Sequence, residues 1–281
     1  MRMTQRTGST SYEAFSTQAE YLELNRSFVQ NLPIEGRNHI LDLACGTGTM
    51  RDLILQRLRF VRITGLDLSF ESLQIAKEHA SSGSVLIQGT ANLLPFPDAV
   101  FDFVVMGNSI QLLTDKRMLV REISRVLRPG GLLAFNTSFY SGTYVAGTER
   151  VYLLWMEMAL RFIQEENERR RVSGADVIKR RKTGSRTQMA QPWLSAAEYG
   201  SLLEGGGFRK PTFQERTVSL RRENLEAIGS YSGLASVLLD GYPVDIACQA
   251  LERSVSSVFE AASVDCVPRN WLECLAVKED H

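Results

Sequence analysis

The chain of 281 residues carries 32 basic and 32 acidic residues, so its formal net charge is zero, and 44% of its residues are hydrophobic. This is the composition of an ordinary globular protein with enough apolar residues for a large core. A zero net charge provides no general attraction to nucleic acid or to an anionic membrane surface, so neither is an expected partner.

The sequence shows neither a membrane segment nor a metal-binding pattern. Its first residues, MRMTQRTGSTSYEAF, are polar, and no window approaches the roughly 18 apolar residues that a spanning helix needs. The cysteines lack CxxC and zinc-ligand spacing; they are Cys45, Cys248, Cys266 and Cys274. We therefore expect a cytoplasmic protein with reduced thiols and no metal ion.

Apolar residues near helical spacing predict a helix over residues 11–31, and strands and helices then alternate as far as residue 138. The expected strands are 39–44, 62–69, 84–89, 101–108 and 132–137, and the expected helices between them are 49–60, 69–80 and 115–131. Ser69 is the expected N-cap of the second of these helices, while Pro129 and Gly130 are expected to end the third. Alternation with short links predicts a doubly wound α/β sheet of mostly parallel strands.

The pattern changes after residue 138. The expected elements are a helix over 144–171, a polar and basic loop to about 191, a helix over 195–208, a strand over 210–220, a mainly helical stretch over 221–265 and a final strand over 271–278. Two helical insertions therefore interrupt the last part of the sheet.

The stretch ILDLACGTGTM, residues 40–50, ends the first strand in an acid and a glycine turn. Ligands of open parallel sheets bind at the carboxyl ends of the strands, and glycines there let the backbone approach a ligand closely. A dinucleotide fold needs G-x-G-x-x-G, but Arg51 stands at the third glycine position and no GK[ST] follows. Asp42 suits a cationic ligand better than a pyrophosphate, which it would repel.

A second acid, Asp67, ends the second strand, 21 residues after Gly46. A carboxylate at this place can accept hydrogen bonds from both ribose hydroxyls of a nucleoside. A ligand with a ribose, a positive charge and no pyrophosphate is S-adenosylmethionine.

Four stretches in order over residues 40–136 extend this pattern: LDLACGTGTM, TGLDLSFESLQIAKEHA, GTANLLPFPDAVFDFVVMGNSIQLLTD and REISRVLRPGGLLAF. They resemble the motifs of the class I S-adenosylmethionine-dependent methyltransferases. The resemblance is nearest to the branch that contains enzymes of ubiquinone and menaquinone biosynthesis and related small-molecule methyltransferases. It implies an α/β fold with a doubly wound, mostly parallel, seven-stranded Rossmann-like sheet, an antiparallel last strand and helical lid insertions.

With this resemblance, the chain divides into four expected parts. They are an N-terminal helical cap over 1–36, a cofactor-binding α/β core over 37–138, a helical lid insertion over 139–205, and the last two strands over 206–281 with a helical insertion at about 221–268. The candidates for the last two strands are residues 210–219 and 271–277.

The resemblance also implies roles for individual residues toward S-adenosylmethionine, whose product is S-adenosylhomocysteine. The backbone at Ala44, Gly46 and Gly48 is expected to face the methionine part, with Asp42 orienting its ammonium group. Asn108 is expected to line the sulfonium region.

On the nucleoside side, the resemblance implies that Asp67 binds the ribose and that Leu68 packs on the adenine. Thr90 and Ala91 are expected near the adenine amino group, although the family usually has aspartate where this chain has Thr90. Tyr12 is expected on an N-terminal helix of the kind that the family often folds over the cofactor, and it is a candidate to contact the cofactor.

Catalytic residues are not identified by the motifs. The family often has histidine where this chain has Gln111, so a histidine base is absent there. This favours an acceptor that is acidic enough to ionise, such as a phenol, enol or carboxylate, or a base from the insertions. The candidates considered are Gln111, Tyr140, Tyr144, Tyr231 and Tyr242.

The expected function is methyl transfer to an oxygen or carbon of a small, partly hydrophobic acceptor. One alternative is an acid bound to a carrier protein or coenzyme A, which the basic run Arg169–Arg171 and Lys179–Lys182 would recognise if it is more than a solvated helix end. A second is a non-catalytic S-adenosylmethionine-binding protein or an RNA modifier.

Overall fold

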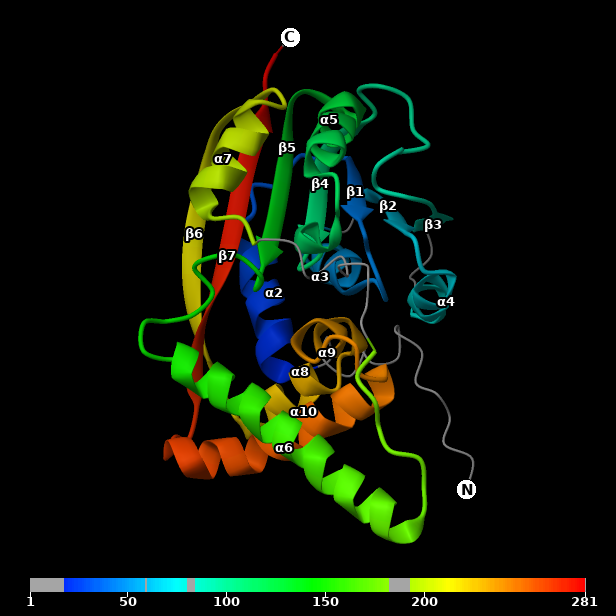
Figure 1. Cartoon of the computed structure of the whole chain (residues 1–281). Coiled ribbons are helices and arrows are strands. Elements are labelled where there is room, and N and C mark those ends of the chain that lie inside the picture. Colours follow the sequence, from blue (N-terminus) through cyan, green and yellow to red (C-terminus); the bar gives the residue numbers. More distant parts are fainter. Residues whose placement is uncertain (1–17, 59, 80–83, 182–192, 281) are drawn as a thin grey trace. The chain divides into compact units, whose positions relative to one another are not determined.

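The computed structural model describes residues 18–58, 60–79, 84–181 and 193–280. They form a seven-stranded sheet of order β3-β2-β1-β4-β5-β7-β6, which can be followed in Figure 1. The strands are β1 His39–Leu43, β2 Arg62–Asp67, β3 Val85–Gln88, β4 Phe101–Gly107, β5 Leu127–Thr137, β6 Phe208–Leu220 and β7 Val267–Lys278.

The chain forms two compact units. The sheet unit comprises Leu22–Thr143, Pro192–Arg216 and Asn270–His281, and the helical unit comprises Met1–Tyr21, Tyr144–Gln191 and Thr217–Arg269. Helix α2 (Ala19–Asn31) and strands β6 and β7 contribute residues to both units.

The sheet is mixed in strand direction, as predicted. Strands β3, β2, β1, β4 and β5 pair in parallel, and β7 pairs with β5 in the antiparallel direction from Leu132↔Val277 to Thr137↔Leu272. The order and directions confirm the doubly wound, mostly parallel α/β fold that the sequence predicts.

Alternate residues of the central strands point to opposite faces of the sheet, and each face has its own core. Leu41 and Val104 belong to the core that includes residues of α5 (Lys116–Val126) and α7 (Ala196–Glu204). Ile40 and Phe103 belong to the core that includes residues of α2 and α3 (Thr49–Arg57). Because these central strands are covered on both faces, they read as nearly continuous apolar runs.

The local start signals hold for several helices. Ser69 caps α4 (Phe70–Glu78) as predicted, since its side chain accepts a hydrogen bond from the Ser72 amide. Ser195 and Glu198 form a capping box at the start of α7, and Asp115 caps α5 by accepting from the Met118 amide. These caps satisfy amides that have no partner within the helix.

One boundary differs from the prediction. Helix α5 ends at Val126, and β5 begins at Leu127, before Pro129 and Gly130. The register between β4 and β5 jumps from Phe101↔Leu127 to Phe103↔Leu132, so residues 128–131 bulge out of the ladder, with Gly130 at φ 67°. The Pro-Gly pair therefore shapes a strand bulge rather than the helix end.

The helical unit contains α6 (Glu149–Ser173), α8 (Arg222–Gly229), α9 (Ser232–Leu238) and α10 (Val244–Ala262). Helix α10 packs against the other three, and the buried Trp155 of α6 donates from its indole nitrogen to the carbonyl of Leu251 at 2.8 Å. Across the part of the chain that the structure describes, no helix combines the length and the apolarity that crossing a membrane requires.

Candidate cofactor site

The strand registers bring the candidate cofactor residues to one edge of the sheet. Asp42 of β1 is level with Gly65 of β2 and with Val105 of β4. Two residues further along, Ala44 is therefore level with Asp67 and Gly107. Gly107 in turn pairs with Asn136 of β5, so four parallel strands deliver their carboxyl ends to the same place.

The glycine loop, residues 44–48, is a tightly held turn between β1 and α3. Its residues Ala44, Gly46 and Gly48 all have left-handed backbone, with φ of 57°, 53° and 93°. The Cys45 amide donates to the Leu66 carbonyl at 3.1 Å, and the Gly48 amide donates to the Cys45 carbonyl at 2.9 Å. The turn thus presents backbone rather than side chains at the carboxyl edge of the sheet.

Asp42 is completely buried beneath this loop. One carboxylate oxygen accepts from the Arg51 amide at 3.0 Å, which caps the first turn of α3, where Gly48 offers no side chain. The other oxygen, Oδ1, has no hydrogen-bond partner among the described residues. The pKa of Asp42 is raised to about 7, chiefly by burial and in smaller part by the nearby Asp67 and Asp52, while the bond from the Arg51 amide and the charge of Arg51 oppose the shift.

Arg51 is a site residue whose placement the sequence does not predict. Its side chain is fully buried under the loop, where Nη1 donates to the Ala76 carbonyl at 2.9 Å and Nε pairs with Asp52 at 2.8 Å. A Cβ added at Gly48 would lie 2.6 Å from Arg51 Nη2. The arginine therefore fills the space below Gly48, and the only sequence signal for this was its occurrence at the third glycine position.

Asp67 connects β2 to the glycine loop. Its carboxylate accepts from the Gly46 amide at 2.7 Å and from the Ser69 amide at 2.8 Å. Both oxygens are therefore fixed in direction, and each keeps capacity to accept another hydrogen bond. The next residue, Leu68, is 69% exposed, which gives an apolar surface directly beside this carboxylate.

Thr90 and Ala91 follow β3 at the same edge. The exposed Thr90 hydroxyl accepts weakly from the Asn92 amide at 3.4 Å, and Ala91 is buried. The Gly89 amide donates to the Asp67 carbonyl at 2.9 Å, so this turn is joined to the end of β2. The geometry leaves the Thr90 hydroxyl available to a ligand.

Asn108 directly follows β4 and has left-handed backbone, with φ 44°. Its side-chain oxygen accepts from the Ser138 amide at 2.9 Å and from the Ser138 hydroxyl at 3.2 Å. The backbone amide of Asn108 donates to Asn136 Oδ1 at 2.9 Å, and Asn136 Nδ2 donates to the side-chain oxygen of Asn25 of α2 at 2.8 Å. Asn108 is thus surrounded by a buried polar network that no sequence motif predicts.

Two of the catalytic candidates, Gln111 and Tyr140, also lie in the sheet unit and already have partners. Gln111 donates to the Asn108 carbonyl at 2.7 Å and accepts from the Thr137 hydroxyl at 2.9 Å. The buried Tyr140 donates to Glu215 of β6 at 2.8 Å. The Gln111 amide is therefore held as part of the network around Asn108.

Tyr144, Tyr231 and Tyr242 lie outside the sheet unit. Tyr12 falls outside the described residues. Burial raises the pKa of Tyr231 to about 12 and also raises that of Tyr144, so both phenols stay protonated near neutral pH and neither provides a phenolate base. Tyr242 follows α9 in the same unit.

Three arginines in the described part of the basic run make local contacts. Arg169 pairs with Glu166 at 3.1 Å, Arg170 pairs with the same carboxylate at 3.2 Å, and Arg180 donates to the Asp240 carbonyl at 2.8 Å. Lys182 falls outside the described residues. These contacts favour the interpretation of residues 169–181 as a solvated helix end and loop.

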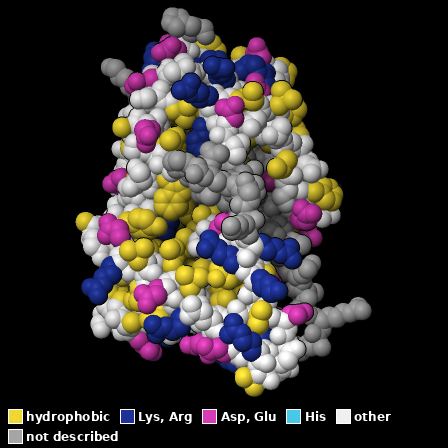
Figure 2. Space-filling model, viewed as in Figure 1, with side chains coloured by type: hydrophobic (Ala, Val, Ile, Leu, Met, Phe, Trp, Pro, Cys, Tyr) yellow, Lys and Arg dark blue, Asp and Glu magenta, His cyan; other side chains and the backbone are white. Residues whose placement is uncertain are grey.

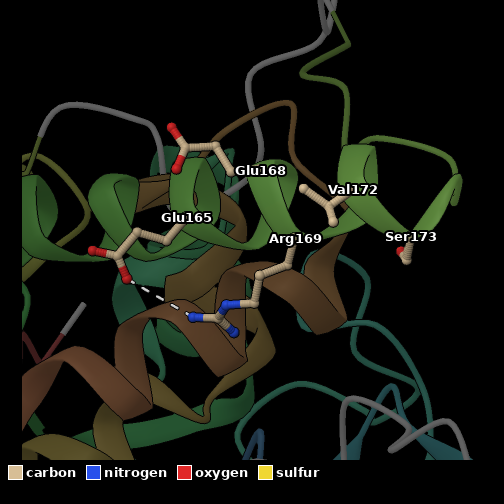
Figure 3. Close-up of a pocket in the computed structure, with 5 residues that line it drawn as sticks. All are labelled: Glu165, Glu168, Arg169, Val172 and Ser173. Atoms are coloured by element: carbon tan, nitrogen blue, oxygen red, sulfur yellow. Dashed lines mark ion pairs between the residues drawn. The ribbon is translucent and has the colours of Figure 1, made fainter.

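A shallow hollow of about 490 Å³ lies along the end of α6, shown in Figure 3. All of its lining residues come from that one helix; they are Glu165, Glu168, Arg169, Val172 and Ser173. Glu165 and Arg169 form an ion pair of 3.9 Å across one turn. The hollow contains none of the candidate cofactor residues.

The candidate residues at the sheet edge lie within a stretch that is similar to known methyltransferases. Residues 41–135 match the family model described as a methyltransferase domain. The chain is 29% identical over 134 residues to a demethylmenaquinone methyltransferase of Listeria monocytogenes, covering 45% of this chain and 56% of that protein. It is 32% identical over 115 residues to a fatty-acid O-methyltransferase of Mycolicibacterium smegmatis, covering 41% and 42%.

Among solved structures, the chain resembles the Haemonchus contortus phosphoethanolamine N-methyltransferase 2 in complex with S-adenosyl-L-methionine. The TM-score is 0.58 at 16% identity, over 98% of this chain and 58% of that one, which shows a common fold. The chain spans about half the length of the curated relatives it matches. Residues 41–135 therefore match a methyltransferase domain, and the chain has the fold of this solved methyltransferase structure.

Proposed function

We propose that the protein is an S-adenosylmethionine-dependent methyltransferase that moves a methyl group to an oxygen or carbon of a small, partly hydrophobic acceptor. The observation that carries the proposal is the edge formed by the glycine loop, Asp67 and Leu68, which lies within the matched methyltransferase domain. S-adenosylmethionine, when bound, supplies a methyl group on a sulfonium, which is an excellent leaving group.

The residues at this edge fit the parts of that cofactor. Asp67 keeps free acceptor capacity on two oxygens whose direction the Gly46 and Ser69 amides fix, which suits a ribose diol. Leu68 offers an exposed apolar surface next to it for an adenine ring. The left-handed backbone of the loop allows close approach by the methionine part.

Asp42 contributes to this fit from below the loop. Its Oδ1 has no hydrogen-bond partner among the described residues, and a ligand that carries a sulfonium and an ammonium group is electrostatically suited to the neighbouring carboxyl groups of Asp42 and Asp67. Because Asp42 has no exposed surface, we propose that it acts on the ligand through the backbone that it holds.

The chain's own contribution to catalysis is then positioning and exclusion of water, because the leaving group needs no activation. Gln111 and Tyr140 are proposed to hold the acceptor side of the site in place through their hydrogen bonds rather than to abstract a proton. An acceptor that ionises in solution would need no protein base.

The relatives are compatible with this acceptor class, since the names of two of them specify a demethylmenaquinone and a fatty acid. The alternative acceptors gain no specific support. Local carboxylates and a local carbonyl already bind three arginines of the basic run, Arg169, Arg170 and Arg180. Figure 2 shows charged side chains of both signs scattered over the visible face.

The cofactor assignment is tested with Asp67→Ala in the full chain. We expect the Kd for S-adenosylmethionine, measured by calorimetry, to rise at least roughly tenfold, because a charge-assisted hydrogen bond is worth about 1.5–3 kcal/mol. The matched control is Asp102→Ala, which also removes an acid that accepts from two backbone amides, those of Asn38 and His39 before and at the start of β1. Unchanged affinity in Asp67→Ala would remove the ribose assignment.

The acceptor class is tested by incubating the purified protein with methyl-labelled S-adenosylmethionine and an extract of host cells. We expect the label in a small apolar product. Label recovered in RNA, or on a carrier protein, would replace the proposed acceptor by one of the alternatives.

A further inference from the structure

In the side-chain amide of Asn108, the oxygen forms hydrogen bonds and the nitrogen forms none among the described residues. Its oxygen accepts from the Ser138 amide and hydroxyl, whereas its nitrogen, Nδ2, is buried and has no hydrogen-bond partner in the described part of the chain. The Ser138 amide can only donate, so the atom that faces it must be the oxygen, and the orientation of the Asn108 side chain is determined. The unpaired group is therefore an N–H donor.

A buried N–H group without a hydrogen-bond partner destabilises the folded protein. Asn108 is only 2% exposed, and it sits in strained left-handed backbone at the carboxyl end of β4. Strain and an unsatisfied donor at the same residue are typical of a functional position. The adjacent Ser109 hydroxyl is also buried, and no described residue forms a hydrogen bond with it.

The polarity of this pair selects a ligand atom. Asn108 Oδ1 already accepts two hydrogen bonds, which fills the capacity of an amide oxygen, so it cannot accept from the N–H of an amine. Nδ2 can donate only. An oxygen of the acceptor is the partner that fits.

We propose that Asn108 Nδ2, assisted by the Ser109 hydroxyl, binds the oxygen of the methyl acceptor, and that the protein therefore selects acceptors with an ionisable oxygen over amines. This inference rests on the proposed function and refines its acceptor class. Asn108 orients the acceptor, and its donor stabilises the ionised oxygen, so no protein base is required at this point.

The test compares oxygen and nitrogen ligands of the same shape on the full chain loaded with S-adenosylhomocysteine. The probes are octanoate against octylamine, and 1-naphthol against 1-naphthylamine, with Kd measured by calorimetry. We expect the wild type to prefer the oxygen ligand of each pair. In Asn108→Asp, which keeps the acceptor for Ser138 but replaces the donor with an oxygen, we expect the Kd of the oxygen ligands to rise at least roughly tenfold.

Asn136→Asp is the matched control, because it makes the same change in the same network at an amide whose Nδ2 already donates to Asn25. We expect it to keep the oxygen preference. Ser109→Ala should weaken the oxygen ligands by a smaller factor.

Several results would overturn the proposal: preference for the amines, binding of neither oxygen ligand, or an unchanged oxygen preference in Asn108→Asp. A loss of S-adenosylhomocysteine affinity in Asn108→Asp as large as the loss for octanoate would assign the donor to the cofactor instead. Failure of the wild type to bind S-adenosylhomocysteine at all would refute the proposed function, which is a separate outcome.

Discussion

Two carboxylates at the ends of neighbouring strands have different tasks in this protein. Asp67 holds two backbone amides and remains partly accessible, so it can meet a ligand. Asp42 is fully buried and caps α3, and the order of the residues alone does not distinguish the two. The difference arises because β1 is central in the sheet and because Arg51 fills the space under the loop.

The burial of Asp42 predicts a pH dependence of stability. Its pKa in the folded protein is about 7, against an ordinary value of 3.8, so protonation favours the folded state. This contribution is complete below the unfolded-state pKa and is lost as the pH rises through about 7. Each unit of pKa difference is worth about 1.4 kcal/mol.

Asp42→Asn removes this titration while keeping an acceptor for the Arg51 amide. We expect its free energy of unfolding, relative to the wild type, to increase by a few kcal/mol between pH 4 and pH 8. Urea unfolding at both pH values measures the change. Two stability curves that run parallel across this range would contradict the assignment of a raised pKa to Asp42.

Gly48 combines a left-handed backbone with a crowded neighbourhood. In Gly48→Ala, the new methyl group meets the buried Arg51 guanidinium at 2.6 Å, and the backbone at φ 93° is strained as well. We expect a loss of more than about 1 kcal/mol of stability together with weaker S-adenosylmethionine binding.

Gly147→Ala is the control for this substitution, because Gly147 has a similar φ of 89° and a Cβ added there would meet no atom of the described residues within 4 Å. It should lose only the part that is due to backbone strain. Urea unfolding measures the loss of stability in both variants. Equal losses would show that the Arg51 side chain moves away from the new methyl group without destabilising the protein.

At the scale of the elements, helix ends were predictable where a side chain forms the cap locally. Ser69 and the Ser72 amide are three residues apart, so the cap of α4 follows from the sequence. The start of β5 could not be predicted from the local sequence, because Leu127 joins the sheet through its pairing with Phe101, 26 residues earlier. Proline and glycine signals alone cannot distinguish a helix end from a bulge.

The Ser69 cap leads to a prediction at this scale. Ser69→Ala should lower the free energy of unfolding by about 1 kcal/mol. It should leave the S-adenosylmethionine affinity nearly unchanged, because the Ser69 amide that binds Asp67 is kept. Ser69→Asp retains a capping oxygen and should keep most of the stability in urea unfolding. A large loss of cofactor affinity in Ser69→Ala would mean that the hydroxyl itself serves the site.

At the scale of the whole molecule, the sheet includes strands that lie far beyond the cofactor motifs in the sequence. The motifs lie within residues 40–136, but β5 is covered on its other edge by β7, over Leu132↔Val277 to Thr137↔Leu272. A fragment that ends at residue 143 contains every motif and lacks β6 and β7. It leaves an apolar strand edge unpaired.

We therefore expect the fragment of residues 1–143 to aggregate or to remain unfolded, although it contains the matched methyltransferase domain. Soluble yield, far-UV circular dichroism and calorimetry with S-adenosylmethionine check this, with the full chain as the control. A soluble fragment that unfolds cooperatively and binds the cofactor would show that β7 is dispensable for the fold.

The sequence by itself determined the alternation of strands and helices, the glycine loop and the acids that follow the first two strands. These features are local, because glycine turns, caps and apolar periods depend on near neighbours. That residues 210–219 and 271–277 belong to the last two strands of the sheet was expected from the family resemblance, and strands β6 and β7 confirm it. That the helical unit closes over the cofactor site as a lid stays a prediction.

Only the tertiary structure decided which buried polar atoms have a hydrogen-bond partner within the described chain and which do not. Ser138, 30 residues away, donates to the side-chain oxygen of Asn108, and Asn108 Nδ2 has no hydrogen-bond partner among the described residues. In the same way, the Arg51 amide donates to one carboxylate oxygen of Asp42, and the other has no partner among those residues. Such pairings arise between residues that the sheet brings together across the sequence. The sequence therefore determined the methyl donor that we propose, and the structure suggests the polarity of the group that receives the methyl.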